Sequence, residues 1–213
     1  MKIYALLFIV LLSTSCTKRR SVRISVYNPI TGERYENIHG GLSERKKDGI
    51  FLGLYNNSKW QTVENFVTDI NGEAGFTYKF LHNHAYFAFI EYSKDEFELY
   101  KINSQIAYSQ KAKFGYAEFQ LIPLAKIKLN IRNVNCQGAQ DTMKLYRVFQ
   151  LDSDSGNPQN FYGCYDFMAN YYSKIKMGEW RYEWEVIRNG ISTFHDTTFY
   201  LNENDSIEVN IFY

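Results

Sequence analysis

Two histidines near the middle of the chain have the spacing of a metal-binding pair. His82 and His84 are two residues apart, so on a β-strand both imidazoles would lie on one face, and imidazole is a common zinc ligand. A zinc site needs a third ligand, which only His39, His195 or a distant carboxylate could supply. Because no second ligand motif is present, the pair is typical of a solvated loop. We predict no metal and no cofactor.

A second candidate for metal binding is the polar stretch around Asp152, Asp154 and Gly156, whose spacing is similar to that of a calcium loop. The twelfth position of that loop requires a bidentate glutamate, and here it is Gly163. The stretch therefore predicts a polar turn.

No catalytic motif is present in the sequence. There is no G-x-S-x-G elbow, glycine-rich phosphate loop or zinc-protease helix. Glu96, Glu98 and Glu118 could in principle form a glycosidase pair, but no spacing marks any two of them. We predict that the protein is not an enzyme.

Three large rings alternate with charged residues late in the chain. Trp180, Tyr182 and Trp184 would share one face of a strand, opposite Arg181, Glu183 and Glu185. Such a face is either a packed core or an exposed platform that stacks on sugar rings. The charged opposite face favours the core.

Trp60 has different surroundings. It follows the polar residues 56–59, which favour an exposed loop, and exposed loop aromatics often contact ligands. The alternative is a structural role, and we predict Trp60 as the first candidate for ligand contact.

The first fifteen residues have the composition of an export signal. Lys2 is followed by an apolar run over residues 3–12 and by three small residues, 13–15, before Cys16. The run is shorter than the roughly 20 residues that span a bilayer. Residues 12–16, Leu-Ser-Thr-Ser-Cys, resemble a lipobox with its leucine one place further upstream than usual. The resemblance implies a bacterial lipoprotein, cleaved after residue 15 and lipidated on Cys16.

Residues 16–21 would then form a lipidated tether. Lys18, Arg19 and Arg20 would lie against anionic headgroups or be solvated. Surface-exported lipoproteins of the Bacteroidota type tend to carry acidic residues at this place. The basic tail therefore favours a protein anchored in the outer membrane of the cell envelope and facing the periplasm.

Two cysteines remain, Cys136 and Cys164, and an even pair in an exported protein suggests a disulfide. The alternative is two buried thiols, because free cysteine is among the most buried residue types.

Length and charge limit the possible functions. Removing residues 1–15 leaves 198 of 213 residues, enough for two domains of about 100 residues each. The mature chain has 23 basic and 23 acidic residues. A neutral chain lacks the basic surface that nucleic acid requires, so we predict no nucleic-acid partner.

Period-two alternation of apolar residues predicts an all-β fold. Strands are expected at 22–26, 50–55, 63–68, 76–80, 85–92, 97–102, 116–121, 126–132, 142–149, 161–172, 179–187, 191–200 and 207–213. The aromatic run 85–92 predicts a strand buried on both faces. Asn71-Gly72 and Asn189-Gly190 predict tight hairpins. Pro123 marks the expected boundary, giving β-sandwich domains at 22–123 and 124–213.

Residues 22–92 resemble the prealbumin-like or carboxypeptidase-regulatory-like β-sandwich. The similarity lies in the Thr-Gly-Glu turn at 31–33, the TDINGEAGF segment at 68–76 and the strand at 86–89. The charged interval 40–59 departs from the family pattern. The second half resembles an immunoglobulin-like sandwich only in outline. The family resemblance implies a docking, stability or adhesion module.

These observations predict a non-catalytic envelope lipoprotein that binds a protein or a glycan, or has a structural role. The alternative is an envelope hydrolase whose catalytic residues are dispersed along the chain.

Overall fold

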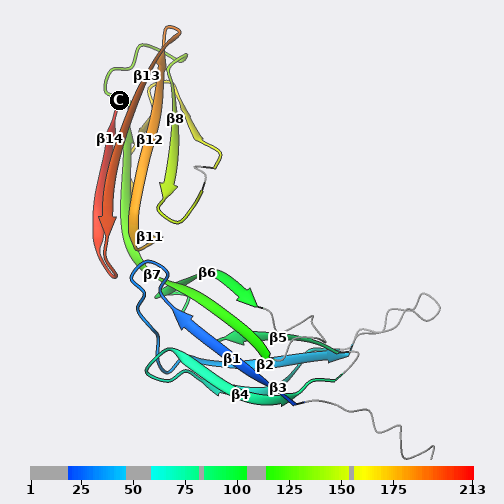
Figure 1. Ribbon diagram of the computed structural model, residues 1–213. Coiled ribbons are helices and arrows are strands. Elements are labelled where there is room, and N and C mark those ends of the chain that lie inside the picture. The colour runs from blue at the N-terminus through cyan, green and yellow to red at the C-terminus, as the bar shows by residue number, and fades with distance from the viewer. Residues whose placement is uncertain (1–18, 47–58, 82–83, 105–113, 154–155) are drawn as a thin grey trace, which may run out of the picture. The chain divides into compact units, whose positions relative to one another are not determined.

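The computed structural model describes residues 19–46, 59–81, 84–104, 114–153 and 156–213. All the regular secondary structure in these residues is β-strand (Figure 1), which confirms the predicted all-β fold. The strand expected at 50–55 lies outside the described residues. The chain divides into two compact units. The described residues of unit 1 lie in the ranges up to Tyr27, Gly32–Tyr92 and Tyr100–Gln120, and those of unit 2 in Asn28–Thr31, Ser93–Leu99 and Leu121–Tyr213.

Unit 1 is a β-sandwich of two sheets. Its own strands are β1 (Arg19–Tyr27), β2 (His39–Lys46), β3 (Gln61–Val67), β4 (Glu73–Lys79) and β5 (His84–Ile90). One sheet has the order β7-β1-β4 and the other β3-β2-β5. Ile24 of the first sheet and Leu42 of the second are fully buried. The rings of Phe66 on β3 and Phe76 on β4 stack with centroids 6.2 Å apart, which joins the two layers.

The turn that contains Asn71-Gly72 does not close a hairpin, so that prediction is wrong. β3 pairs with β2, whereas β4 pairs with β1, and the turn passes the chain from one sheet to the other. The Asp69 carboxylate accepts the backbone N–H groups of Asn71 and Glu73. Gly72 has φ +67° and its carbonyl accepts the Val26 N–H at 2.8 Å, so the turn docks on β1.

Strand β7 (Phe114–Arg132) contributes to both units, and β6 (Phe97–Ser104) pairs with it. We expected separate strands at 116–121 and 126–132, and this is wrong, because β7 is continuous through Pro123. The domain boundary at Pro123 stays a prediction. Proline removes only one N–H, and the Pro123 carbonyl still accepts the Met177 N–H at 2.9 Å. Pro123 lies between the end of the pairing with β1, at Gln120, and the start of the pairing with β14, at Lys126.

Unit 2 is a second sandwich. Its strands are β8 (Thr142–Phe149), β9 (Gln159–Tyr162), β10 (Asp166–Phe167), β11 (Ser173–Lys176), β12 (Gly178–Arg188), β13 (Ile191–Leu201) and β14 (Ser206–Phe212). One sheet has the order β13-β12-β8-β9. In the other, β7 pairs with β14 along one edge and with β10 and β11 along the other. The fully buried residues between the sheets include Ile131, Leu145, Tyr182 and Ile211.

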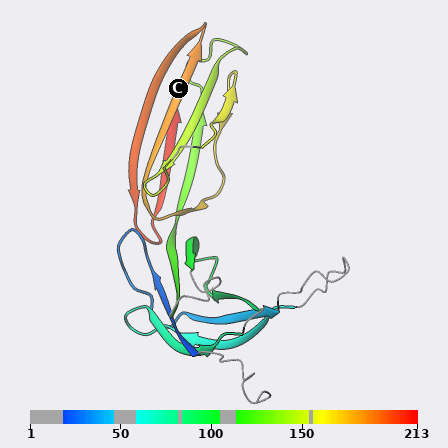
Figure 2. The same ribbon diagram turned by 45° about the vertical axis from the view of Figure 1, so that its right-hand side comes forward.

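The Asn189-Gly190 hairpin is confirmed. Arg188 pairs with Ile191, and the two turn residues have φ +49° and +79°, as a type I′ turn requires. Its strands β12 and β13, drawn in orange, run side by side in both views (Figures 1 and 2). The last expected strand is also present, and β14 pairs in parallel with β7.

Candidate functional site

Trp60 lies at the surface of unit 1, immediately before β3, with 41% of its area exposed. The edge of its ring meets the ring of Phe87 on β5, with centroids 4.6 Å apart. The guanidinium carbon of Arg45 on β2 lies 4.8 Å from the centre of the Trp60 ring, within cation–π range. Residues of two strands, β2 and β5, therefore hold one indole at the surface. That Trp60 contacts a ligand stays a prediction.

The rings continue along the outer side of the β3-β2-β5 sheet. Phe89 follows Phe87 on the same side of β5, with centroids 6.1 Å apart. Both rings stand opposite small residues of β2, because Phe89 pairs with Gly41 and Phe87 with Ser43. A Cβ on Gly41 would come within 2.8 Å of the Phe89 ring, so only glycine leaves room for it. We call Arg45, Trp60, Phe87 and Phe89 the aromatic face.

The expectation that 85–92 is buried on both sides is wrong for Phe87, which is 39% exposed. The rest of β5 is buried or half-buried. Sequence reasoning found Trp60 but missed Phe87 and Phe89, because a run rich in aromatic residues does not show which ring faces solvent. The pairing of Gly41 with Phe89 is the signal that identifies this face.

Unit 2 carries a second aromatic surface. A pocket of about 280 Å³ opens beside Trp180 and Tyr182, with Phe167 and Tyr171 also lining it. Arg147 and Lys174 are the charged residues of its lining. The Trp180 ring is fixed by its Nε1–H, which donates to the Lys176 carbonyl at 2.9 Å.

The predicted core role of the Trp180–Trp184 face is confirmed in part. Tyr182 is 1% exposed, and both tryptophans pack against the core of unit 2 while remaining half-buried. Trp184 also stacks on His195 of β13, with centroids 5.7 Å apart.

The carboxylate of Glu118 is held as an anion in unit 1. It accepts hydrogen bonds from the hydroxyls of Tyr116, at 2.6 Å, and Tyr27, and from the Gln120 amide. These donors lower the pKa of Glu118, with the Tyr116 bond the largest cause. Burial, together with the bond to Glu118, raises the pKa of Tyr116 to about 12. A carboxyl with a lowered pKa is a poor general acid.

The histidine and aspartate candidates that the structure describes do not form a metal site. Among the residues that the structure describes, no three His, Cys, Asp or Glu side chains could hold a metal ion together. His82 and Asp154 lie outside those residues. Asp152 forms an ion pair with Lys176, with 3.7 Å between Oδ2 and Nζ.

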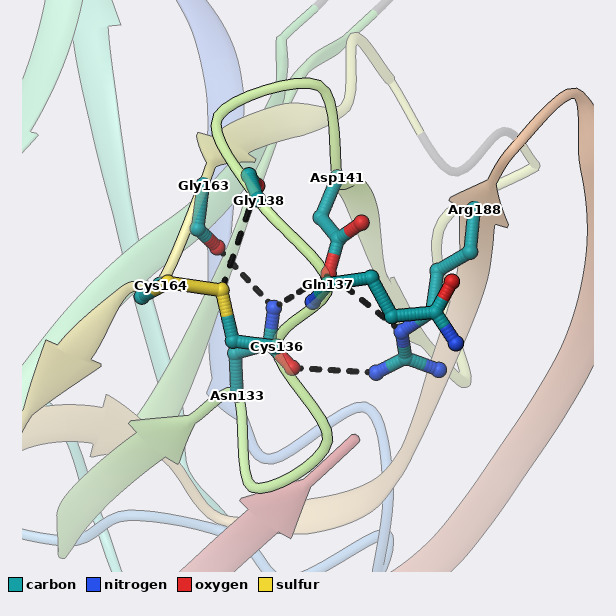
Figure 3. Close-up of a disulfide and its surroundings, with 8 residues drawn as sticks. All are labelled: Asn133, Cys136, Gln137, Gly138, Asp141, Gly163, Cys164 and Arg188. Atoms are coloured by element: carbon teal, nitrogen blue, oxygen red, sulfur yellow. Dashed lines mark hydrogen bonds and ion pairs between the residues drawn. A yellow bond between two sulfur atoms is a disulfide. The ribbon is translucent and has the colours of Figure 1, made fainter.

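Cys136 and Cys164 form a disulfide at one end of unit 2, as predicted, with Cα atoms 5.1 Å apart (Figure 3). The buried side chain of Asn133 ties the same loops together. Its amide donates to the Asp141 carboxylate at 3.0 Å and to the Gly163 carbonyl at 2.9 Å, and its oxygen accepts from Arg188.

Asp141, 2% exposed, is the anion of this network (Figure 3). Its carboxylate accepts the Gln137 N–H at 2.9 Å, and the Nε of Arg188 lies 3.4 Å away as an ion pair. The Gln137 N–H is the largest cause that lowers the pKa of Asp141, followed by the Asn133 amide. The network therefore stabilises the ionised form, and its role is structural.

No family model and no curated protein matches the chain. The similar solved structures include a streptococcal ancillary pilin, with 12% identity, 92% of this chain and 63% of that chain covered, and a TM-score of 0.34. A minor pilin of Streptococcus agalactiae has 12% identity, coverage of 91% and 94%, and a TM-score of 0.34. A variant of the shaft pilin of Lactobacillus rhamnosus GG has 7% identity, coverage of 92% and 97%, and a TM-score of 0.35.

At such TM-scores the likeness says nothing of this chain's function or partners. The β-sandwich implied by the prealbumin-like resemblance is confirmed by the sheets themselves, while membership of that family stays a prediction. The described residues contain no helix long and apolar enough to cross a membrane.

Replacing both Cys136 and Cys164 by alanine should lower the free energy of unfolding of unit 2 by about 3.5 kcal/mol, because the unfolded chain loses the constraint of a closed loop. Urea unfolding followed by Trp180 and Trp184 fluorescence in a Trp60→Phe background measures this. The parent chain treated with reductant should show the same loss. An unchanged midpoint in the double variant would contradict it.

Asp141 should make the stability of unit 2 sensitive to acid. Its folded pKa lies below the usual value of 3.8, so the unfolded chain binds the proton first. The stabilisation is complete above about pH 5 and is lost as the pH falls through the folded pKa. Urea unfolding from pH 6 to about pH 2 should therefore show a shallower acid loss in Asp141→Asn than in the parent. Identical slopes would rule out this role.

Proposed function

We propose that the protein is a non-catalytic binding module of the bacterial envelope, tethered to a membrane by lipid on Cys16 and contacting its ligand through the aromatic face. Cys16 lies outside the described residues, and the tether is supported by the sequence of residues 1–16. The basic residues that follow favour an outer-membrane anchor that faces the periplasm.

The observation that carries this proposal is the exposure of fixed rings in unit 1. Trp60 and Phe87 are 41% and 39% exposed while their rings contact each other, and Arg45 lies over the Trp60 ring. Aromatic side chains have few rotatable bonds, so ordering them on binding costs little entropy, and here they are already ordered. Such a surface suits a ligand that presents a flat apolar face.

Two ligand classes fit these contacts. The apolar face of a sugar ring can stack on the indole, and an aromatic or aliphatic side chain of a protein partner can pack on the same rings. Arg45 is the one cation of the aromatic face, and the mature chain has no net charge by composition. Binding should therefore depend on shape and stacking, with weak dependence on salt.

Substituting Trp60 by alanine should weaken ligand binding at least about tenfold and leave the fold intact, because an exposed ring contributes little to stability. A glycan array of cell-wall and capsular fragments, followed by cross-linking in envelope extracts, separates the two ligand classes. Tyr162→Ala is the control, because it removes a ring from unit 2 that is even more exposed than Trp60, 64% against 41%. Equal binding by parent and Trp60→Ala would contradict the assignment of this face.

Cys16→Ala should abolish lipid labelling and membrane association, because it removes the acceptor thiol. Fractionation of cells and mass spectrometry of the mature N-terminus measure both. If the variant still sediments with membranes and has a mature N-terminus elsewhere, the lipoprotein proposal is wrong.

A further inference from the structure

Strand β13 forms one margin of its sheet in unit 2 (Figure 2). It pairs with β12 along all eleven residues and with no other described strand. In a hairpin closed by a two-residue turn, the residues flanking the turn exchange both hydrogen bonds, and bonded pairs then alternate. Arg188 and Ile191 flank this turn, so the odd residues of β13 bond to β12. The N–H and C=O groups of residues 192, 194, 196, 198 and 200 point away from it.

This edge lacks most of the features with which sheets avoid pairing, and Asp196 is its one carboxylate. β13 contains no lysine, arginine, proline or glycine, and its sequence is ISTFHDTTFYL. Three other margins differ, because β9 has four residues, β4 contains Gly75 and the β2–β3 pair has an irregular register. Phe194 and Tyr200 are 76% and 48% exposed on the outer side of β13.

We propose that β13 is a self-association edge, at which a second copy of this chain adds its own β13 in antiparallel orientation. In a two-fold pair whose outer sides lie on one surface of the joined sheet, even-numbered residues of one copy face even-numbered residues of the other. The symmetry axis then passes through a residue and not between two residues. An axis through Asp196 would place two carboxylates opposite each other, which is unfavourable. An axis through His195 would place Tyr200 opposite the turn residue Gly190.

An axis through Thr197 avoids both problems. Phe194 then faces Tyr200 of the second copy, and Asp196 faces Thr198 of the second copy. The outward groups of these residues would form about eight backbone hydrogen bonds between the copies. The edge is therefore complementary to itself in this register, and this favours a second copy over an unrelated strand.

Sedimentation equilibrium of the full chain carrying Cys16→Ser, which removes the lipid and the third thiol, should show a reversible dimer. Phe194→Lys removes two aromatic pairs, and Thr198→Pro removes two outward N–H groups without touching the pairing with β12. Each should raise the dimer dissociation constant at least about tenfold. Ile191→Lys is the matched control, because Ile191 is 69% exposed on the same strand but lies outside the proposed register. A monomer at all concentrations, or a dimer that both variants leave unchanged, overturns the proposal.

The register has a separate test. The Thr197 residues of the two copies would form a non-bonded pair with Cα atoms about 4.5 Å apart, within the range of a disulfide. Thr197→Cys should therefore give a cross-linked dimer on mild oxidation, whereas Thr193→Cys, which would face Leu201, should not. Equal cross-linking of both variants, or none in Thr197→Cys, rejects this register.

Discussion

The hydrogen bonds of β7 are the interaction on which both units depend. Its first half pairs with β1, and its second half pairs with β14 on one edge and with β10 and β11 on the other. The residues near the change of partners, Phe119, Leu121 and Ile122, are almost completely buried. A strand that loses water from both edges and one face must have all its polar groups paired. This requirement explains why five strands pair with β7, namely β1, β6, β10, β11 and β14.

The sequence predicts those parts of the fold that local periodicity and turn geometry determine. The bounds of β8 and the Asn189-Gly190 turn follow from alternation and from left-handed backbone preference. The same dipeptide, Asn71-Gly72, does not close a hairpin. The Val26 N–H donates to the Gly72 carbonyl, and β3 and β4 pair with β2 and β1 and not with each other. The strands expected on either side of Pro123 form one strand for a similar reason. The cost of a proline depends on which edge of the strand needs its N–H, and only the tertiary partners decide this.

The same limit applies to the candidate site. The polar residues before Trp60 are enough to predict its exposure, and the charged side of β12 is enough to place Tyr182 inside. Nothing local shows that Phe87 faces solvent or that Phe89 needs glycine opposite it, because both facts arise from the pairing of β5 with β2. The disulfide illustrates the opposite case. Redox compartment and an even cysteine count predict the bond, but only the fold shows that Asp141 and Asn133 share the loops it closes.

The aromatic face and the β13 edge recognise different chemistry. The proposed tether would affect how often the β13 edges of two copies meet. The aromatic face presents side chains and selects by shape, whereas the β13 edge presents backbone groups and selects by register. An isolated edge-to-edge contact buries little area and is weak in dilute solution. Chains anchored by Cys16 in one membrane would meet at a much higher effective concentration. Anchoring would therefore favour pairing of copies at the β13 edge even where its affinity in solution is modest.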